Sequence, residues 1–464
     1  MQKLNKNYVN ENGLQEKQLL NINKKIPATE RVLQFGGGNF LRAFVDYFID
    51  VMNEKSLFDG SVVVIKPIPN RNENTISVED HINKQDGLYT TFLNDSTGSD
   101  GRIITSISRC IDPHIDYNAY EKVFLQEDIR FIVSNTTEAG IVYDENVKLT
   151  DTLPKNFPGK ITSLLYKRYK HFDGAKDKGF IFIPCELIDD NGKTLKEIIL
   201  KHSKDWGLEE GFVTWVKESN YFTNTLVDRI VTGFPKNKEE YYERTGFIDD
   251  MLVTAEKFGF FAVEIEEGDD FIADEFPLEK AGLAIYTKDV SPYKLRKVRI
   301  LNGAHTSTAL LGHLLGLETV LELSNDDIMG KFLKKAIFEE IIPSITELGE
   351  EELISFADDV VKRFKNPYIE HQLMSIALNS VSKFAVRVVP SILGYVQNKK
   401  ELPKMLTISF AALIKFYEKY PEENTGESKG LREELSKIQG FEELLSNYLE
   451  AMETDIHTFL KEVL

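Results

Sequence analysis

The stretch that decides the fold is RVLQFGGGNFLRAF, residues 31–44. Its first five residues predict a short buried strand, and the apolar periodicity from Asn39 to about Met52 predicts a helix. Three glycines, Gly36–Gly38, separate the two elements. A strand, a glycine turn and a helix in this order are typical of the opening of a dinucleotide-binding fold, in which the helix N-terminus faces a pyrophosphate.

This glycine fingerprint is incomplete. Gly36 and Gly38 fill the first two glycine positions, but Leu41 stands where the third glycine is expected. On these residues alone, a glycine-rich turn without a ligand and a dinucleotide site are about equally well supported.

Three further runs predict strands of the same parallel sheet. They are residues 61–65, 130–134 and 178–186. Ligands bind outside the carboxyl ends of such strands, so Asn135 and Glu138 are candidates for a cofactor or substrate site, with an ordinary loop as the alternative. The strand 61–65 should end beside the adenosine ribose, where an acid favours NAD, but Lys66 stands there. NADP therefore remains an alternative to NAD.

Length and patterning predict two domains. The chain has 464 residues, and after Lys288 the strand and turn alternation gives way to helical runs. We expect an α/β, Rossmann-like dinucleotide-binding domain over residues 1–285 and an all-α domain over residues 286–464. The helical runs are 291–316, 326–340, 350–364, 367–385, 400–420 and 430–463.

Composition excludes several classes of protein. The net charge of −18 would repel a phosphate backbone, so we expect no nucleic-acid partner. Cys110 and Cys185, the only cysteines, stand far apart and without metal-ligand spacing, so neither a disulfide scaffold nor a metal site is predicted. A polar N-terminus and the absence of an uncharged apolar span predict a cytoplasmic protein without a membrane anchor. Oligomeric state stays open, and a monomer is compatible with the sequence.

A second informative stretch carries Lys297, Asn302 and His305 on one predicted helix that starts at Ser291-Pro292. At about 100° per residue these three side chains fall within an arc of roughly 140°. Gly303 inside the helix suggests that a backbone or ligand approaches closely there. A solvated helix face is the ordinary alternative. Together, however, a lysine can exchange a proton with a substrate oxygen, an asparagine amide can stabilise developing charge and a histidine can hold the lysine in place.

The pattern Lys-x4-Asn-x2-His resembles the signature of the polyol-specific long-chain dehydrogenases, the mannitol dehydrogenase family. Gly-x-Gly-x-Phe-x-Arg at residues 36–42, Val-Asp-Arg-Ile at 227–230 and Arg-Phe-x-Asn-Pro at 363–367 are similar to other motifs of that family. The resemblance implies a Rossmann-like half and a helical half, with Lys297 as acid/base against the nicotinamide of NAD. The cofactor-binding residues it implies are Phe35, Gly36, Gly37, Gly38, Asn39, Phe40 and Arg42, to which the crevice at the strand ends adds Asn135 and Glu138. The substrate-binding residues it implies are Asp228, Arg363, His371 and Lys383.

The chain departs from the mannitol-type pattern in two places. Cys185-Glu186-Leu187 stands where that pattern has Cys-Asp-Asn, so Asn191 becomes the candidate for the missing oxyanion amide. Met374-Ser375 replaces arginines, and Arg387 lies further downstream. Lys383 and Arg387 are four residues apart on a predicted helix and share a face, where they could bind a substrate carboxylate, although a solvated basic pair is the alternative.

The resemblance, which covers nearly the whole chain to about residue 395, implies reversible hydride transfer between NADH and the keto carbon of the hexuronate D-tagaturonate, giving D-altronate. A fructuronate reductase or a mannitol-type polyol dehydrogenase is the alternative among enzymes. A nucleotide-sensing binding protein is the alternative among non-enzymes, and the combination of Lys297, Asn302 and His305 argues against it.

Overall fold

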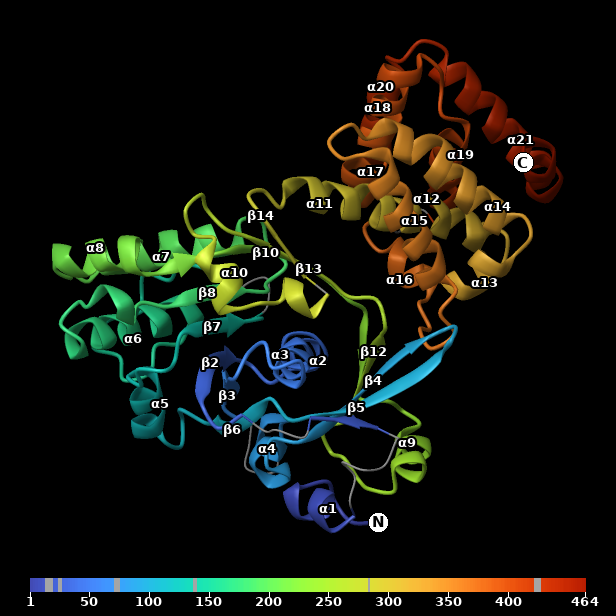
Figure 1. The fold of residues 1–464 in the computed structure, drawn as a ribbon. Coiled ribbons are helices and arrows are strands. Elements are labelled where there is room, and N and C mark those ends of the chain that lie inside the picture. Colours follow the sequence, from blue (N-terminus) through green and yellow to red (C-terminus); the bar gives the residue numbers. More distant parts are fainter. Residues whose placement is uncertain (13–19, 24–26, 71–75, 137–139, 283, 421–426) are drawn as a thin grey trace. The chain divides into compact units, whose positions relative to one another are not determined.

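The chain forms two compact units (Figure 1). The computed structural model describes all residues except 13–19, 24–26, 71–75, 137–139, 283 and 421–426. The first unit comprises Met1–Asn94 and Gly98–Val290, and the second comprises Asp95–Thr97 and Ser291–Leu464. The domain boundary expected near residue 285 lies shortly before this division and stays a prediction. Among the described helices, none has the length and apolar character needed to cross a membrane.

A six-stranded sheet is the centre of the first unit. Its strands are β2 (Glu30–Phe35), β3 (Ser61–Ile65), β6 (Ile107–Ile111), β7 (Phe131–Ser134), β8 (Ile181–Pro184) and β9 (Tyr221–Phe222). They are paired in parallel in the order β6-β3-β2-β7-β8-β9. In chain order this is the doubly wound arrangement, whose direction reverses between β2 and β7, and a ligand crevice is expected at the carboxyl ends there. The predicted Rossmann-type fold is confirmed.

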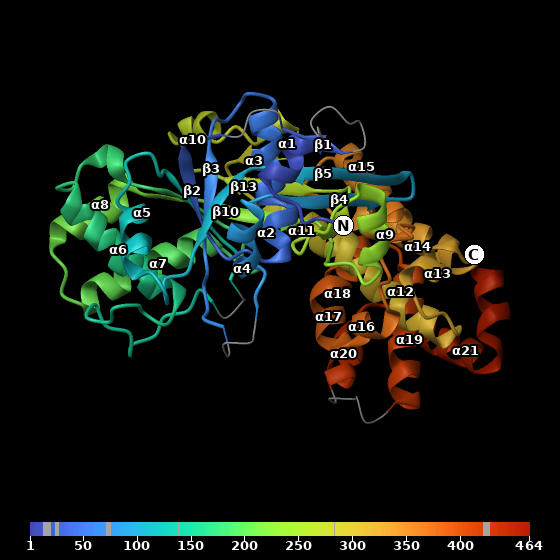
Figure 2. The same cartoon turned by 90° about the horizontal axis from the view of Figure 1, so that it is seen from below.

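Helices cover both faces of this sheet (Figure 2). One face packs against α2 (Asn39–Ala43) and α3 (Val45–Glu54). The other packs against α5 (Tyr117–Phe124), α6 (Phe157–His171), α7 (Asn191–Asp205) and α8 (Glu210–Ser219). The strand residues alternate accordingly: Val62 and Val64 belong to the first core, and Val63 and Ile65 to the second. The single helix expected up to Met52 is interrupted at Phe44, whose φ of −127° and ψ of −80° are not helical.

Two smaller sheets complete the first unit. One has the order β1-β5-β4-β12-β11 and the other the order β10-β13-β14. Their strands are β1 (Asn21–Ile22), β4 (Tyr89–Asp95), β5 (Gly98–Ile104), β10 (Asn224–Asp228), β11 (Val231–Gly233), β12 (Val253–Glu256), β13 (Phe260–Glu264) and β14 (Ala284–Thr287). The remaining short helices are α1 (Lys6–Glu11), α4 (Glu79–Ile82), η1 (Asn83–Gln85), η2 (Lys176–Lys178), α9 (Lys238–Thr245), α10 (Phe271–Glu275) and η3 (Glu279–Ala281).

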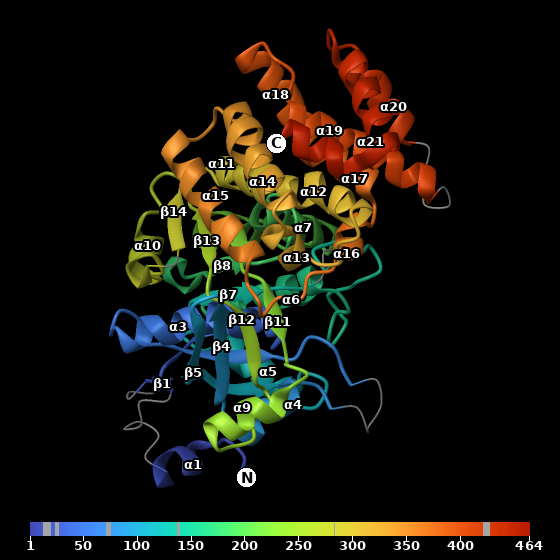
Figure 3. The same cartoon turned by 90° about the vertical axis from the view of Figure 1, so that its right-hand side faces the viewer.

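The second unit is helical, as predicted, and α12 (Gly303–Leu314) packs against α14, α16, α17 and α19 (Figure 3). The other elements are α11 (Ser291–Arg296), η4 (Lys297–Asn302), α13 (Val320–Asn325), α14 (Met329–Lys334), η5 (Lys335–Ile341), η6 (Ile342–Ser344), α15 (Glu350–Phe364), α16 (Leu373–Ala377), α17 (Ser380–Arg387), α18 (Val389–Lys399), α19 (Lys404–Lys419), α20 (Glu427–Leu435) and α21 (Phe441–Val463).

Four predicted helical runs are divided: 326–340 between α14 and η5, 430–463 between α20 and α21, and two more that carry candidate site residues. The run 291–316 contains the π-helical segment η4 between α11 and α12. The run 367–385 becomes α16 and α17, because Asn379 between them adopts a left-handed conformation with φ of 56°. These breaks set the direction of the side chains of the candidate site.

A buried ion pair connects α3 to β5 in the first unit. Arg102 Nε lies 2.7 Å from Asp50 Oδ2, and the two side chains are 7% and 0% exposed. We predict that Arg102→Met lowers the free energy of unfolding by about 3–5 kcal/mol, because it leaves a buried carboxylate without its cation.

Urea unfolding followed by tryptophan fluorescence measures this loss, because Trp206 and Trp215, the only tryptophans, both lie in the first unit. Lys176→Met is the control: it removes an ion pair to Glu218 in which both partners are exposed (82% and 56%), and it should change the free energy by less than about 0.5 kcal/mol. Equal effects of the two variants would contradict the assignment.

Candidate functional site

The glycine turn after β2 leaves open space above its backbone. Gly36 has φ of +108°, a conformation that favours glycine, and its N–H donates to Ile65 O at 3.0 Å. Gly38 has φ of −62° and precedes α2. A Cβ added at Gly36 or Gly38 would meet no described atom within 4 Å. A ligand can therefore approach the backbone at both positions.

Arg42 lies beneath this turn. Its Nε donates to Gly37 O at 2.9 Å, a second nitrogen donates to Asn39 Oδ1 at 2.7 Å, and the third donates to Met251 O. The residue is 1% exposed. Arg42 was expected to contact the cofactor. Because all three of its nitrogens donate to groups of the protein, Arg42 instead positions the glycine turn.

Two neighbouring residues that were predicted to bind the cofactor also contact the protein itself. Gly37 N–H donates to Glu79 Oε1 at 3.2 Å. The Phe40 ring packs against the core, stacked on Phe44 with ring centroids 5.0 Å apart. In this turn, Gly36 and Gly38 are the two positions that the structure leaves open to a ligand.

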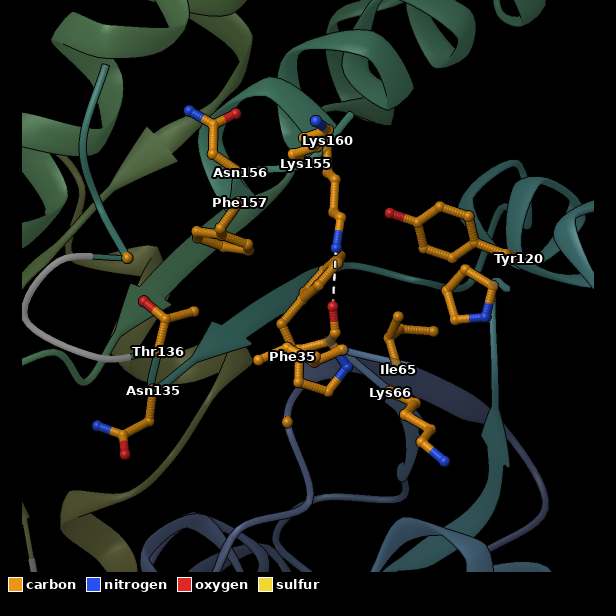
Figure 4. A pocket seen from close by; sticks show the side chains of 15 residues that line it. Phe35, Ile65, Lys66, Tyr120, Asn135, Thr136, Lys155, Asn156, Phe157 and Lys160 are labelled. Carbon is orange, nitrogen blue, oxygen red and sulfur yellow. Dashed lines mark hydrogen bonds between the residues drawn. The ribbon is translucent and has the colours of Figure 1, made fainter. Parts of the chain in front are cut away.

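A cavity of about 400 Å³ lies at the carboxyl ends of β2, β3 and β7 (Figure 4). Its lining is mainly apolar and includes Phe35, Ile65, Tyr120 and Phe157, with Asn135 at the end of β7. The Asn135 amide donates to Cys185 O at 2.6 Å and so links the ends of β7 and β8. Glu138, the other residue expected here, lies outside the described residues.

The Tyr120 hydroxyl is the polar group that distinguishes this cavity. It is buried and has no hydrogen-bond partner among the described residues. Burial raises the pKa of this phenol well above its usual value, so the group is a neutral donor. An open glycine backbone, an apolar cavity and an unpartnered donor fit a dinucleotide. Sequence analysis missed Tyr120 because nothing in the amphipathic pattern of α5 distinguishes a cavity-lining ring from a core ring.

Asn191, expected as a catalytic amide, is 1% exposed at the start of α7. Its Nδ2 donates to Pro184 O and Glu186 O, each at 3.1 Å, and its Oδ1 accepts from Thr225 N at 2.9 Å. An amide so committed fixes the loop between β8 and α7, and it has no capacity left for substrate charge. The catalytic role expected for Asn191 is therefore corrected to a structural one.

Asp228, expected to contact substrate hydroxyls, is 5% exposed at the end of β10. Its contact with substrate hydroxyls stays a prediction.

The π-helical segment η4 brings Lys297 and Asn302 onto one face. Gly303 N–H donates to Val298 O, a bond that spans five residues. Lys297 and Asn302 are also five residues apart, the spacing that such a hydrogen bond spans, so they lie closer together around the helix axis than in an α-helix. His305 follows three residues later in α12 and continues the same face. The α-helical arc expected for these residues is wrong, and the π turn aligns them more closely.

Arg299 anchors η4 to two neighbouring helical segments. Its Nε donates to Ser391 Oγ and its Nη2 to Ser344 Oγ, both at 2.7 Å. The segment is therefore tied to α18 and η6.

His305 lies against the second predicted motif. Its ring stacks on Phe364 with centroids 4.2 Å apart, and it meets the His371 ring edge-on at 4.9 Å. The imidazole Nδ1 is buried and lacks a hydrogen-bond partner within the described part of the chain. Burial holds the pKa of this imidazole well below its usual value, and the charges of His371, Arg363 and Arg387 act in the same direction. His305 is therefore neutral.

Lys383 and Arg387 join this cluster from α17. Arg387 Nη1 donates to Thr306 Oγ1 at 3.3 Å, and Lys383 Nζ donates to Ile376 O at 3.0 Å. Burial lowers the pKa of Lys383, and the charge of Arg387 lowers it further. A backbone or ligand was expected to approach Gly303 closely. The nearest atom to a Cβ added there is the Arg387 carbonyl oxygen at 3.4 Å, which is an ordinary contact.

We call Arg363, His371, Lys383 and Arg387 the cationic cluster. Arg363, His371 and Arg387 act electrostatically on His305, Lys383 acts on His371, and Arg387 acts on Lys383. The structure thus brings together the predicted substrate residues of the helical unit.

Comparisons with known proteins agree with both halves of the chain. Residues 30–280 match the mannitol dehydrogenase Rossmann domain, and residues 289–448 match the mannitol dehydrogenase C-terminal domain. The chain belongs to the mannitol dehydrogenase family.

Curated members of the mannitol dehydrogenase family are similar over most of this chain. An altronate oxidoreductase of Bacillus subtilis (strain 168) is 44% identical over 423 residues, 89% of this chain and 84% of the relative. An altronate oxidoreductase of Shigella flexneri is 43% identical over 426 residues, 90% of this chain and 86% of the relative.

Two solved structures share the fold. A substrate-free D-sorbitol dehydrogenase has a TM-score of 0.76 at 21% identity and covers 89% of this chain and 85% of its own. A Pseudomonas fluorescens mannitol 2-dehydrogenase in complex with NAD and D-mannitol has a TM-score of 0.70 at 20% identity and covers 99% of both chains.

Proposed function

We propose that this chain is an NAD-dependent oxidoreductase that interconverts D-tagaturonate and D-altronate. The observation that carries the proposal is the cationic cluster beside His305, because an acidic sugar brings a carboxylate that a polyol lacks. The identity of 43–44% to curated altronate oxidoreductases supports the same substrate.

Reduction of the ketone requires a hydride at carbon and a proton at oxygen. NADH, when bound, supplies the hydride. Lys297 donates the proton to the ketone oxygen, which leaves a neutral amine, and in the oxidation of altronate that amine removes the hydroxyl proton. Lys297 is half-buried, which suits a lysine that exchanges a proton.

Asn302 and His305 assist this proton transfer. The Asn302 amide, one π turn from Lys297, donates a hydrogen bond to the oxygen as negative charge develops on it. His305, neutral and stacked on Phe364, limits the positions that the lysine and substrate can take.

The cationic cluster provides recognition of the acid. Arg363 and Arg387 carry planar guanidinium groups that suit a bidentate carboxylate partner, and Lys383 adds a point charge. A fructuronate reductase would use the same groups, and the configuration of the sugar hydroxyls would separate the two substrates. A mannitol-type substrate has no charge for the cluster to bind, and a nucleotide sensor has no use for Lys297.

We predict that Gly38→Val weakens NADH binding at least tenfold. Gly38 has φ of −62°, ψ of 166° and open space at Cβ, so valine fits the fold but occupies the volume that the ligand needs. Gly349→Val is a matched control, since Gly349 also precedes a helix with φ of −63°, ψ of 142° and open space. Isothermal titration calorimetry with NADH measures both, and an equal affinity in the two variants would refute the placement.

We predict that Lys297→Ala lowers turnover of D-tagaturonate by about 10²–10⁴-fold, the usual scale of general acid–base catalysis. The measurement is the decay of nicotinamide absorbance with NADH and D-tagaturonate. Lys334→Ala, which removes an exposed lysine of α14, should leave turnover unchanged. Near-normal turnover of Lys297→Ala would exclude this lysine as the acid, and absence of turnover in the wild-type protein would reject the function.

We predict that Lys383→Met and Arg387→Met raise the Michaelis constant for D-tagaturonate about tenfold or more and reduce the preference for the uronate over an uncharged ketose. A hydrogen bond to a charged group contributes about 1.5–3 kcal/mol. Lys399→Met, an exposed lysine at the end of α18, is the control. Unchanged discrimination in both cluster variants would mean that the carboxylate binds elsewhere.

A further inference from the structure

Lys66 stands at the position that controls cofactor choice in this fold. It directly follows β3 and lines the 400 Å³ cavity. An NAD-selective site has an acid at the end of this strand, which accepts hydrogen bonds from the ribose and repels the 2′-phosphate of NADP. A lysine presented there would instead attract that phosphate.

The Lys66 ammonium is already occupied by the protein. It donates to Asp80 Oδ1 at 2.6 Å and to Asn70 Oδ1 at 2.8 Å, and Asp112 Oδ2 lies 3.6 Å away. Its side chain is 3% exposed. Two of the three ammonium donors therefore make hydrogen bonds, and the Asp112 carboxylate adds a second negative charge nearby. Figure 4 shows the Lys66 side chain directed away from Lys160, the other buried lysine of the cavity.

The two carboxylates are held in place by their own contacts. Asp80 Oδ2 accepts from Asn70 Nδ2 at 2.9 Å and from Ser77 N at 2.8 Å. Asp112 Oδ1 accepts from His114 N at 2.9 Å. Two fixed negative charges therefore surround one positive charge, which leaves the strand end with a net negative charge.

Glu79 adds to this negative charge. It precedes Asp80 in α4, and its carboxylate accepts from Gly37 N at the glycine turn. The acid missing from the end of β3 is thus supplied from α4 and from the residue after β6.

Lys160 is the competing cation. Its Nζ donates to Pro67 O at 2.9 Å, as the dashed line in Figure 4 shows. Burial lowers the pKa of this lysine. Any phosphate bound through Lys160 would not depend on Asp80 or Asp112, so an experiment can separate the two lysines.

We propose that Asp80 and Asp112 neutralise Lys66 and thereby make this site select NAD over NADP. The inference rests on the proposed function for the presence of a dinucleotide. A 2′-phosphate would meet an ammonium whose charge is already neutralised, with two of its three donors committed, and two carboxylates that repel it.

The test is the ratio of NADH to NADPH dissociation constants, measured by isothermal titration calorimetry without substrate. The wild-type protein should prefer NADH. Asp80→Asn/Asp112→Asn should shift the ratio toward NADPH at least tenfold, which corresponds to about 1.4 kcal/mol. Adding Lys66→Met to that variant should abolish the gain, because Lys66 is the cation that the double substitution releases.

Asp128→Asn/Asp173→Asn is the charge-matched control, since it removes two exposed carboxylates of the same unit and should leave the ratio unchanged. If the double variant of Asp80 and Asp112 does not fold, Asp112→Asn alone should shift the ratio in the same direction by a smaller factor.

Three results would overturn the inference: preference of the wild-type protein for NADPH, a ratio that stays within threefold of wild type in a folded variant, or a gain that survives Lys66→Met, which would point to Lys160. Binding of neither dinucleotide would reject both this inference and the proposed function. Tight NADH binding without turnover of D-tagaturonate would reject the proposed function alone.

Discussion

The buried guanidinium of Arg42 is the interaction on which the dinucleotide half of the molecule depends. A turn of three glycines has little conformational preference of its own, so its shape must be imposed from outside. Arg42 imposes it by binding Gly37 O and Asn39 on the turn and Met251 O on the chain before β12. Because the guanidinium lies below the turn, the upper side of Gly36 and Gly38 stays open. The same residue thus connects two sheets and leaves the ligand side clear.

In the helical unit, the comparable constraint is the extra residue of η4. A regular α-helix would place Lys297 and Asn302 on different parts of the helix surface, and the five-residue turn places them on one face. Arg299 holds this less favourable turn through two serine hydroxyls.

Much of this organisation is visible in the sequence, because strands, glycine turn and the Lys-x4-Asn-x2-His pattern are local. What the sequence did not reveal depends on distant residues. No residue pattern in 291–316 predicts a π turn, so a regular α-helix was expected there. Asn191 looked available until its loop contacts were known. From the sequence, Lys66 is expected to bind a phosphate. Asp80 and Asp112 are 14 and 46 positions away from it, and only the fold brings them next to it.

The cationic cluster also has a consequence for the free protein. Lys383 and Arg387 lie close enough for their charges to repel each other, and the packing of α17 holds them there against that repulsion. An anion that binds there relieves the repulsion and, by linkage, shifts the folding equilibrium toward the native state. The thermal stability of the protein should therefore rise with the concentration of an anion that occupies the cluster.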